Sequence, residues 1–186
     1  MRTQKYEPQL GSNVVYLTTQ YPSDPERYAM IRQACLKILS SENTFNDFTP
    51  ISISDSRQGT ALGIVFKVPD DMSRGHLRQY ALICHCDDEQ LLMGSWKLIA
   101  AHLNLIKTSI QQRAAKEYEK EETLRRTSSG GLDQYLRTRR ESKQHPPRSL
   151  TSVLKDDQFY GELHSQFAYV LSLLNKKYRF SKPFLK

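Results

Sequence analysis

Hydrophobic and polar residues alternate with a period of two over two stretches of the chain, which is the pattern of a half-buried β-strand. In residues 61–70 the apolar face carries Leu62, Ile64, Phe66 and Val68. In residues 78–86 the corresponding face carries Tyr80, Leu82, Cys84 and Cys86. Shorter strands are expected at 13–20 and 49–54, while residues 90–93 are too few to assign. Strands that follow one another with short connections predict an antiparallel meander.

Three other segments repeat their apolar residues every three or four positions, which predicts amphipathic helices. Ser23 and Glu26 fit a capping box at the start of the first helix. The second helix is expected from an N-cap at Ser95 to about residue 122, and the third from Asp156 or Asp157. The expected buried stripes are Tyr28, Ile31, Cys35 and Ile38; then Trp96, Ile99, Leu103, Ile106 and Ile110; then Phe159, Leu163, Phe167, Val170 and Leu174.

Helices with one apolar face need a sheet to cover, so the pattern predicts an α+β fold with a small central antiparallel β-meander covered by helices. The 186 residues suffice for one domain. Residues 1–12 are expected to be a polar, disordered leader, and residues 13–124 the core. Residues 125–148 are expected to form a basic flexible loop. Residues 149–186 then hold the last helix of the same domain and a basic tail.

The net charge of +7 is concentrated in two segments. Residues 125–148 carry seven Lys or Arg against two acids, and residues 176–186 carry five with none, so the rest of the chain sums to −3. A run of charged residues in a flexible segment usually only keeps that segment in contact with water and has no binding role. One alternative is nucleic-acid binding, although Tyr135 is the only aromatic residue within the loop, which argues against a single-strand platform. Another alternative is contact with an anionic membrane surface.

The three cysteines, Cys35, Cys84 and Cys86, include no C-x-x-C pair and fit a reducing compartment. The triplet Cys84-His85-Cys86 suggests a metal site, but on a strand His85 points to the opposite face from the two thiols. We therefore expect buried cysteines and no metal or cofactor.

No nucleotide-binding, nucleophile-elbow or metalloprotease motif occurs in the sequence. The acid pairs at 70–71, 87–88 and 156–157 fall at strand ends or helix starts, where turns and caps explain them. His164 lies beside an apolar stripe and is expected to be a structural hydrogen-bonding residue. The chain is therefore not expected to contain an active site of its own.

The connection between the two long strands, Pro69 to Gly75, ends in Arg74 followed by Gly75. Gly75 supplies the positive-φ geometry with which the chain turns back. Arg74 would then be exposed on a stiff two-stranded arm, with a permanently charged planar fork suited to phosphate oxygens. Taken alone, a surface arginine at a hairpin end usually serves solubility.

Several segments in order resemble the longin domain of the folliculin family: "YPSDPERYAMIRQACLKILS", "SRGHLRQYALI", "GSWKLI" and "RSLTSVLKDDQFYGELHSQFAYVL". The likeness runs from about Val14 to about Leu174, and its firmest parts are "IRQAC", the "[A/S]RG" hairpin tip and "RSLTS…DD". The chain is similar to short family members that lack the DENN-like domain. Family members begin with two apolar strands, which residues 1–12 do not contain, so these strands are expected to be missing, either because the chain is a fragment or because its sheet has fewer strands.

The resemblance implies activation of GTP hydrolysis by a Rag-type small GTPase of the C/D class, in nutrient and TOR signalling. It implies a folliculin-interacting partner with a longin domain, recruitment from the cytoplasm to the vacuolar or lysosomal surface, and no enzymatic activity of the chain itself. Arg74 matches the family's arginine finger, which acts in trans. The alternative is a non-catalytic longin scaffold that bridges the partner and the GTPase.

Overall fold

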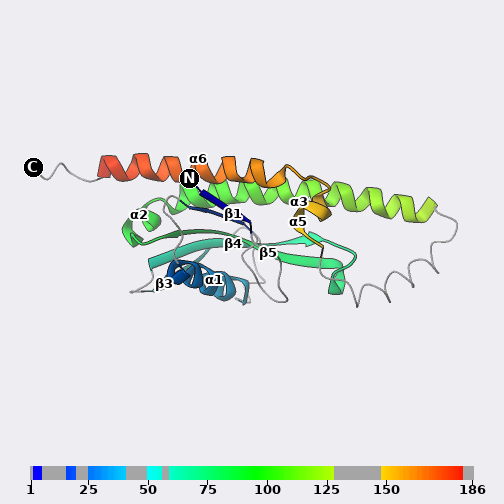
Figure 1. The fold of residues 1–186 in the computed structure, drawn as a ribbon, viewed down its shortest axis with the longest axis horizontal. Coiled ribbons are helices and arrows are strands. Elements are labelled where there is room, and N and C mark those ends of the chain that lie inside the picture. Colours follow the sequence, from blue (N-terminus) through cyan, green and yellow to red (C-terminus); the bar gives the residue numbers. More distant parts are fainter. Residues whose placement is uncertain are drawn as a thin grey trace, which may run out of the picture.

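The structure is a computed structural model that describes residues 2–5, 16–19, 25–40, 50–55, 59–127 and 148–181. A three-stranded sheet lies between helices (Figure 1). Helix α1 (Pro25–Ser40) covers one face of this sheet, and α3 (Trp96–Thr127) covers the other, with α6 (Phe159–Ser181) packed on α3. This arrangement confirms the predicted α+β fold.

The sheet is an antiparallel meander of β3 (Ile51–Asp55), β4 (Gly59–Pro69) and β5 (Leu77–Cys86), as the sequence predicts. The β4–β5 ladder runs without interruption from Thr60 opposite Cys86 to Pro69 opposite Leu77. This hairpin is twice as long as β3, so its far end extends beyond the region where three strands lie side by side. The end that extends is the one that carries the Arg74 tip.

The core lies between the sheet and α3. The apolar face of β4 is buried as predicted: Leu62, Ile64, Phe66 and Val68 are each at most 2% exposed. Five α3 residues meet this face, namely Ile99, Leu103, Ile106, Ile110 and Ala114. On the other face, Gly63 allows α1 to approach closely, because a Cβ there would lie 2.9 Å from Ile38 Cδ1.

Trp96 does not belong to the buried stripe of α3 and is 42% exposed, so that part of the prediction is wrong. Ser95, only 2% exposed, is the inward-facing residue at this end. The stripe steps back from Ile99 by four residues, and the carbonyl of Ser95 accepts the Ile99 N–H at 3.0 Å. Ser95 therefore precedes the helix at the predicted position, but its buried hydroxyl makes no hydrogen bond within the described part of the chain, so the predicted capping bond is not formed. Trp96, one residue later, faces away from the core.

Residues 90–93 belong to a short helix, α2 (Glu89–Gly94). Asp88 caps it: its Oδ1 accepts the Leu91 N–H at 2.9 Å. The capping role expected for this acid pair is thus confirmed at Asp88. Helix α3 also ends later than predicted, at Thr127, and its last turns carry the ion pairs Lys120–Glu117 and Arg126–Glu122.

A short helix, α5 (Leu150–Leu154), precedes α6 and was not expected, since the last helix was predicted to begin at Asp156 or Asp157. Lys155 ends α5 in the left-handed conformation, with φ 50°. Asp156 then caps the next turn, since its Oδ1 accepts the Gln158 N–H at 2.9 Å. The predicted stripe of α6 is confirmed, with Phe159, Leu163, Val170 and Leu174 buried and Phe167 partly buried.

Two strands precede α1: residues 16–19 form the strand predicted at 13–20, whereas residues 2–5 form a strand in the segment expected to be a disordered leader, so a strand pair is present where none was expected. The strand β1 (Arg2–Lys5) pairs antiparallel with β2 (Tyr16–Thr19) as a separate two-stranded sheet. The β1 sequence RTQK has no apolar alternation, so its pattern gives no strand signal. Residues 6–12 of the expected leader, Ser23 of the expected capping box and 128–147 of the expected loop lie outside the described residues.

Strand β2 is held against α6. The Tyr16 ring stacks on Tyr160 with centroids 5.0 Å apart, and it lies 6.4 Å from Phe167. Thr18 Oγ1 lies 3.2 Å from His164 Nδ1, within hydrogen-bond distance. The role predicted for His164, a structural hydrogen-bonding residue, is confirmed.

Replacing Gly59 by alanine should lower the free energy of unfolding by about 1–3 kcal/mol, measured by urea denaturation. Gly59 has φ +80°, and an added Cβ would lie 2.7 Å from the Cys86 carbonyl oxygen. Gly161 of α6, where an added Cβ meets nothing within 4 Å, is the control. Gly161→Ala should raise the stability by up to about 1 kcal/mol, and equal effects of the two changes would contradict the packing at Gly59.

Candidate functional site

The tip of the β4–β5 hairpin contains residues 70–76, which connect Pro69 to Leu77. It ends in a 3₁₀ turn, η1 (Arg74–His76). Gly75 has φ 77° and ψ 16°, which confirms the predicted positive-φ geometry. An added Cβ at Gly75 would meet nothing within 4 Å, so the backbone conformation, not lack of space, favours glycine here. The backbone of Arg74 lies in this turn, while its side chain lies outside the described part of the structure.

Asp70, at the base of the tip, is completely buried. Its Oδ1 accepts the Met72 N–H at 3.2 Å, and its Oδ2 accepts the Ser73 hydroxyl at 2.8 Å. Its backbone N–H donates to the His76 carbonyl at 3.0 Å, and its carbonyl accepts the Ser73 N–H at 2.9 Å. One residue therefore closes the tip through both its backbone and its side chain.

Two arginines neutralise this buried carboxylate. Arg78 Nη2 lies 2.8 Å from Oδ2 of Asp70. Arg148 donates to Oδ1 from Nε at 2.9 Å and from Nη2 at 2.5 Å. The arginines are also joined to each other, because Arg78 Nη1 donates to the Arg148 carbonyl. The carboxylate thus receives five donors, which is the dense pairing that a buried charge requires.

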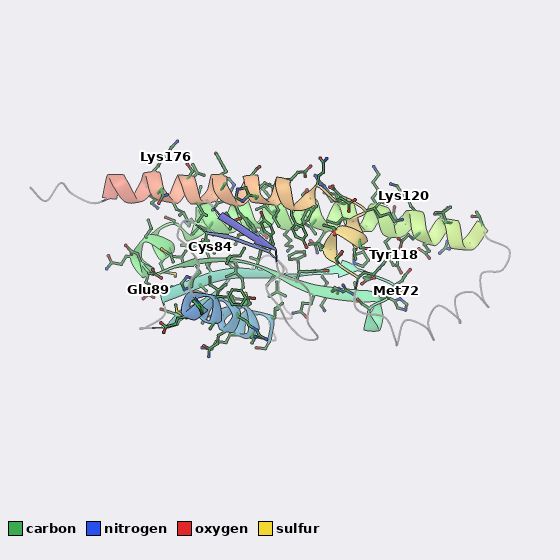
Figure 2. The ribbon with its side chains drawn as sticks, in the orientation of Figure 1. Met72, Cys84, Glu89, Tyr118, Lys120 and Lys176 are labelled. Carbon is green, nitrogen blue, oxygen red and sulfur yellow. The ribbon has the colours of Figure 1, made fainter. Side chains whose placement is uncertain are left out.

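The same group reaches α3. Arg148 Nη1 lies 3.4 Å from Glu121 Oε1, and Glu121 also pairs with Lys155 at 3.1 Å. We call Asp70, Ser73, Arg78, Glu121 and Arg148 the Asp70 cluster. It joins the hairpin, the last part of α3 and the segment just before α5 in one network of charges. Figure 2 shows Met72 of the tip at the same end of the molecule as Tyr118 and Lys120 of α3.

Burial raises the pKa of Asp70, but the hydrogen bonds from Arg148 and Ser73 and the charges of Arg148 and Arg78 outweigh it, so that pKa lies below 3.8. Asp70 is therefore ionised at neutral pH. Removing one partner of such a buried pair typically costs about 3–5 kcal/mol, because the other charge stays buried. The side chains of Arg78 and Arg148 are 17% and 25% exposed. If Asp70 is removed, water can therefore partly solvate the two arginine charges that are left without it.

The sequence indicates the Arg74 tip but not the Asp70 cluster. Asp70 is expected there only as a turn residue. Its alternation with the buried residues of β4 is a signal that it faces inward, since Phe66, Val68 and Asp70 share one face. Arg148 lies 78 residues away along the chain, and no local pattern links it to Asp70.

The cysteines occupy the places that the strand period predicts. Cys84 is buried, and Cys86 is partly buried against the same core. His85 lies on the opposite face of β5, where it lines a small cavity beneath α1 together with Lys37. No group of three potential metal ligands occurs among the described residues.

These elements define the class of the protein: an α+β domain compatible with a longin-like fold. The tip of its β4–β5 hairpin is held by the Asp70 cluster. The sequence matches the family model named Folliculin, described as a vesicle coat protein involved in Golgi to plasma membrane transport, over residues 14–174. The chain therefore belongs to the folliculin family.

Similarity to individual proteins of this family supports the same assignment. The chain is 29% identical over 164 residues to Folliculin of Homo sapiens, an alignment that covers 86% of this chain and 28% of that protein. It is 27% identical over 173 residues to Protein LST7 of Saccharomyces cerevisiae, covering 86% of this chain and 69% of that protein. Folliculin-like protein bhd1 of Schizosaccharomyces pombe matches at 27% over 94 residues, which is 47% of this chain and 26% of that protein. The chain spans only 28% of the length of the vertebrate folliculins that it matches.

Among the described residues, none of the helices has both the length and the apolar character to cross a bilayer.

Asp70→Asn should be much less stable than wild type at pH 6, and this difference should shrink as the pH falls toward 3. A carboxyl group whose pKa is lowered by folding stabilises the protein above its unfolded pKa, and this contribution is lost as the pH falls through its folded pKa, below 3.8. Urea denaturation at pH 6, 5, 4 and 3 measures the difference. Glu162→Gln, which changes an exposed carboxylate paired with Arg113, is the control and should cost at most about 1 kcal/mol. If the difference in free energy of unfolding between wild type and Asp70→Asn is the same at pH 3 as at pH 6, Asp70 is not ionised in the folded protein.

Cys84 should resist alkylation by iodoacetamide at pH 8 in the native protein. Burial raises the pKa of its thiol to about 12, with a further contribution from Cys86. Because only the thiolate reacts, the reactive fraction at pH 8 is about 10⁻⁴. Mass spectrometry of protein labelled with and without urea measures the effect, and full labelling without urea would contradict the burial of Cys84.

Proposed function

We propose that this chain is a GTPase-activating subunit for a Rag-type small GTPase of the C/D class in nutrient and TOR signalling. Arg74 is inserted from the hairpin tip into the nucleotide site of the GTPase. The chain acts as a heterodimer with a folliculin-interacting-type longin partner, at the vacuolar or lysosomal surface. Membership in the folliculin family supports this class of function.

The observation that carries the proposal is the backbone of the tip. Arg74 lies between Ser73, which is bonded to Asp70, and Gly75, which has the φ of 77° that turns the chain back. An eleven-residue strand leads to this tip and a ten-residue strand leads away from it. A turn at the end of two paired strands suits a residue whose side chain must reach an atom in another protein while its own backbone stays fixed.

The chemistry of the reaction explains why an arginine is required. In GTP hydrolysis, negative charge builds on the oxygens around the transferred phosphoryl group, and the protein accelerates the reaction by positioning and neutralising this charge. A guanidinium remains charged at all relevant pH values and offers planar donors that match phosphate oxygens. Where an arginine is supplied in trans, its effect is about 10³–10⁵ in rate.

Arg74→Ala should abolish the stimulation of GTP hydrolysis, and Arg74→Lys should retain only a small part of it, because an ammonium lacks the planar fork. The measurement is single-turnover hydrolysis by the Rag-type GTPase, followed by phosphate release, with the chain in complex with its longin partner. Arg126→Ala, which removes another exposed arginine that pairs with Glu122, is the control and should stimulate like wild type.

Assembly of the complex is measured in parallel by size-exclusion chromatography for each variant. Equal hydrolysis rates for wild type and Arg74→Ala, with unchanged assembly, would reject the catalytic role and leave the non-catalytic scaffold as the function.

A further inference from the structure

We propose that Asp70 and Arg148 are positioning residues for the hairpin tip: they hold the Ser73–Arg74–Gly75 backbone in one conformation and tie it to α3. The expected effect on GTP hydrolysis rests on the proposed function. The expected effect on the conformation of the tip does not, so it can be measured without a GTPase.

The β4–β5 ladder by itself does not determine the conformation of the tip. Its last pair is Pro69 with Leu77, so the seven residues between them lie beyond the strands. Gly75 has open space around it, and glycine has more accessible conformations than any other residue. Something other than strand pairing must therefore select the turn that is observed.

Asp70 supplies the bonds that select it. Its carboxylate accepts from Met72 N and Ser73 Oγ, and its main chain bonds to Ser73 and to His76. These residues flank Arg74 on both sides. The Ser73 hydroxyl also accepts from Arg78 Nε at 3.1 Å, which fixes the serine from the β5 side. The conformation around Arg74 thus depends on one buried carboxylate and the groups bonded to it.

Arg148 connects the tip to helix α3. It binds Oδ1 of Asp70 with two nitrogens, and its Nη1 lies 3.4 Å from Glu121 of α3. Without this connection the tip would lose its charged link to α3. With it, the position of the turn is set relative to a 32-residue helix.

Such positioning matters for a group that acts in trans. A misplacement of about 1 Å can cost about 10²-fold in rate when a reaction depends on orientation. A loosened tip would still carry the charge of Arg74 and could still approach the GTPase. The loss should therefore fall on the maximal rate and only weakly on the affinity.

The variants are Arg148→Met, which removes the connection to Glu121 and two of the five donors to Asp70, and Ser73→Ala, which keeps every charge. Ser73→Ala guards against the case in which Arg148→Met does not fold. The matched control is Arg113→Met. Arg113 also joins α3 to the C-terminal segment, through Asp156 at 3.1 Å and Glu162 at 2.7 Å, but these contacts do not involve the tip.

The first measurement is hydrogen exchange of the backbone amides in the full chain, without a GTPase or a longin partner. The Ser73 and His76 amides, which are hydrogen-bonded within the tip, should exchange at least about 10-fold faster in Arg148→Met and Ser73→Ala than in Arg113→Met. The amides of the β4–β5 ladder should be unchanged. Unchanged tip exchange, or equal acceleration of tip and ladder, would overturn the proposal.

The second measurement is single-turnover GTP hydrolysis over a range of concentrations of the complex. Arg148→Met and Ser73→Ala should lower the maximal rate by about 10- to 10²-fold, while the concentration for half-maximal stimulation changes less than about 3-fold. Arg113→Met should change neither. If Arg74→Ala removes stimulation but Arg148→Met and Ser73→Ala keep the full rate, the positioning role is wrong. If Arg74→Ala itself has no effect, the proposed function fails, and the exchange of the tip amides alone decides the positioning role.

Discussion

An ionised carboxylate, Asp70, is buried where the long hairpin leaves the sheet, and the arrangement of that end of the domain depends on how its charge is neutralised. An isolated carboxylate in such a place would be too costly to ionise. Two arginines from different parts of the chain, Arg78 and Arg148, make it stable there. Because the groups must meet in a fixed geometry, the charge specifies how the hairpin, α3 and the start of α5 fit together, as buried ion pairs do in some other proteins.

Apolar packing along β4 holds the hairpin in the position that the ion pairs of Asp70 require. Asp70 directly follows β4 and continues the alternation of its buried face, which carries Phe66 and Val68 and packs in the main core with α3. The hairpin is therefore anchored along its length by apolar contacts and at its end by charge. Apolar packing is tolerant of small shifts, whereas hydrogen bonds to a carboxylate require particular distances and angles. The two kinds of contact are thus complementary: the first fixes the strands, and the second fixes the turn.

The sequence predicts the parts of this structure that are periodic. The buried face of β4 from Leu62 to Val68 and the α3 stripe from Ile99 to Ile110 follow directly from spacing, and Gly75 follows from the requirement of a tight turn. The prediction for Trp96 is wrong because residues three and four positions before Ile99 both lie near its helix face, and only the packing shows that Ser95 is the buried one. The strand β1 has no periodic signal, since it consists of polar residues. The Asp70–Arg148 pair does not follow from the sequence, because local patterns carry no information on contacts between residues 78 positions apart.

The close approach of α1 to the sheet has an evolutionary consequence. Gly63 and Ile38 share a space in which one extra carbon at position 63 would meet the end of the isoleucine side chain. A larger residue at position 63 needs more space on the α1 side, from a smaller residue at position 38 or an outward shift of the helix, and it also needs Ile83 to yield, because the Ile83 Cγ1 would lie 3.0 Å from the added carbon. Substitutions at these two positions should therefore arise together in homologous chains, so that the combined side-chain volume, and not either residue alone, is maintained by selection.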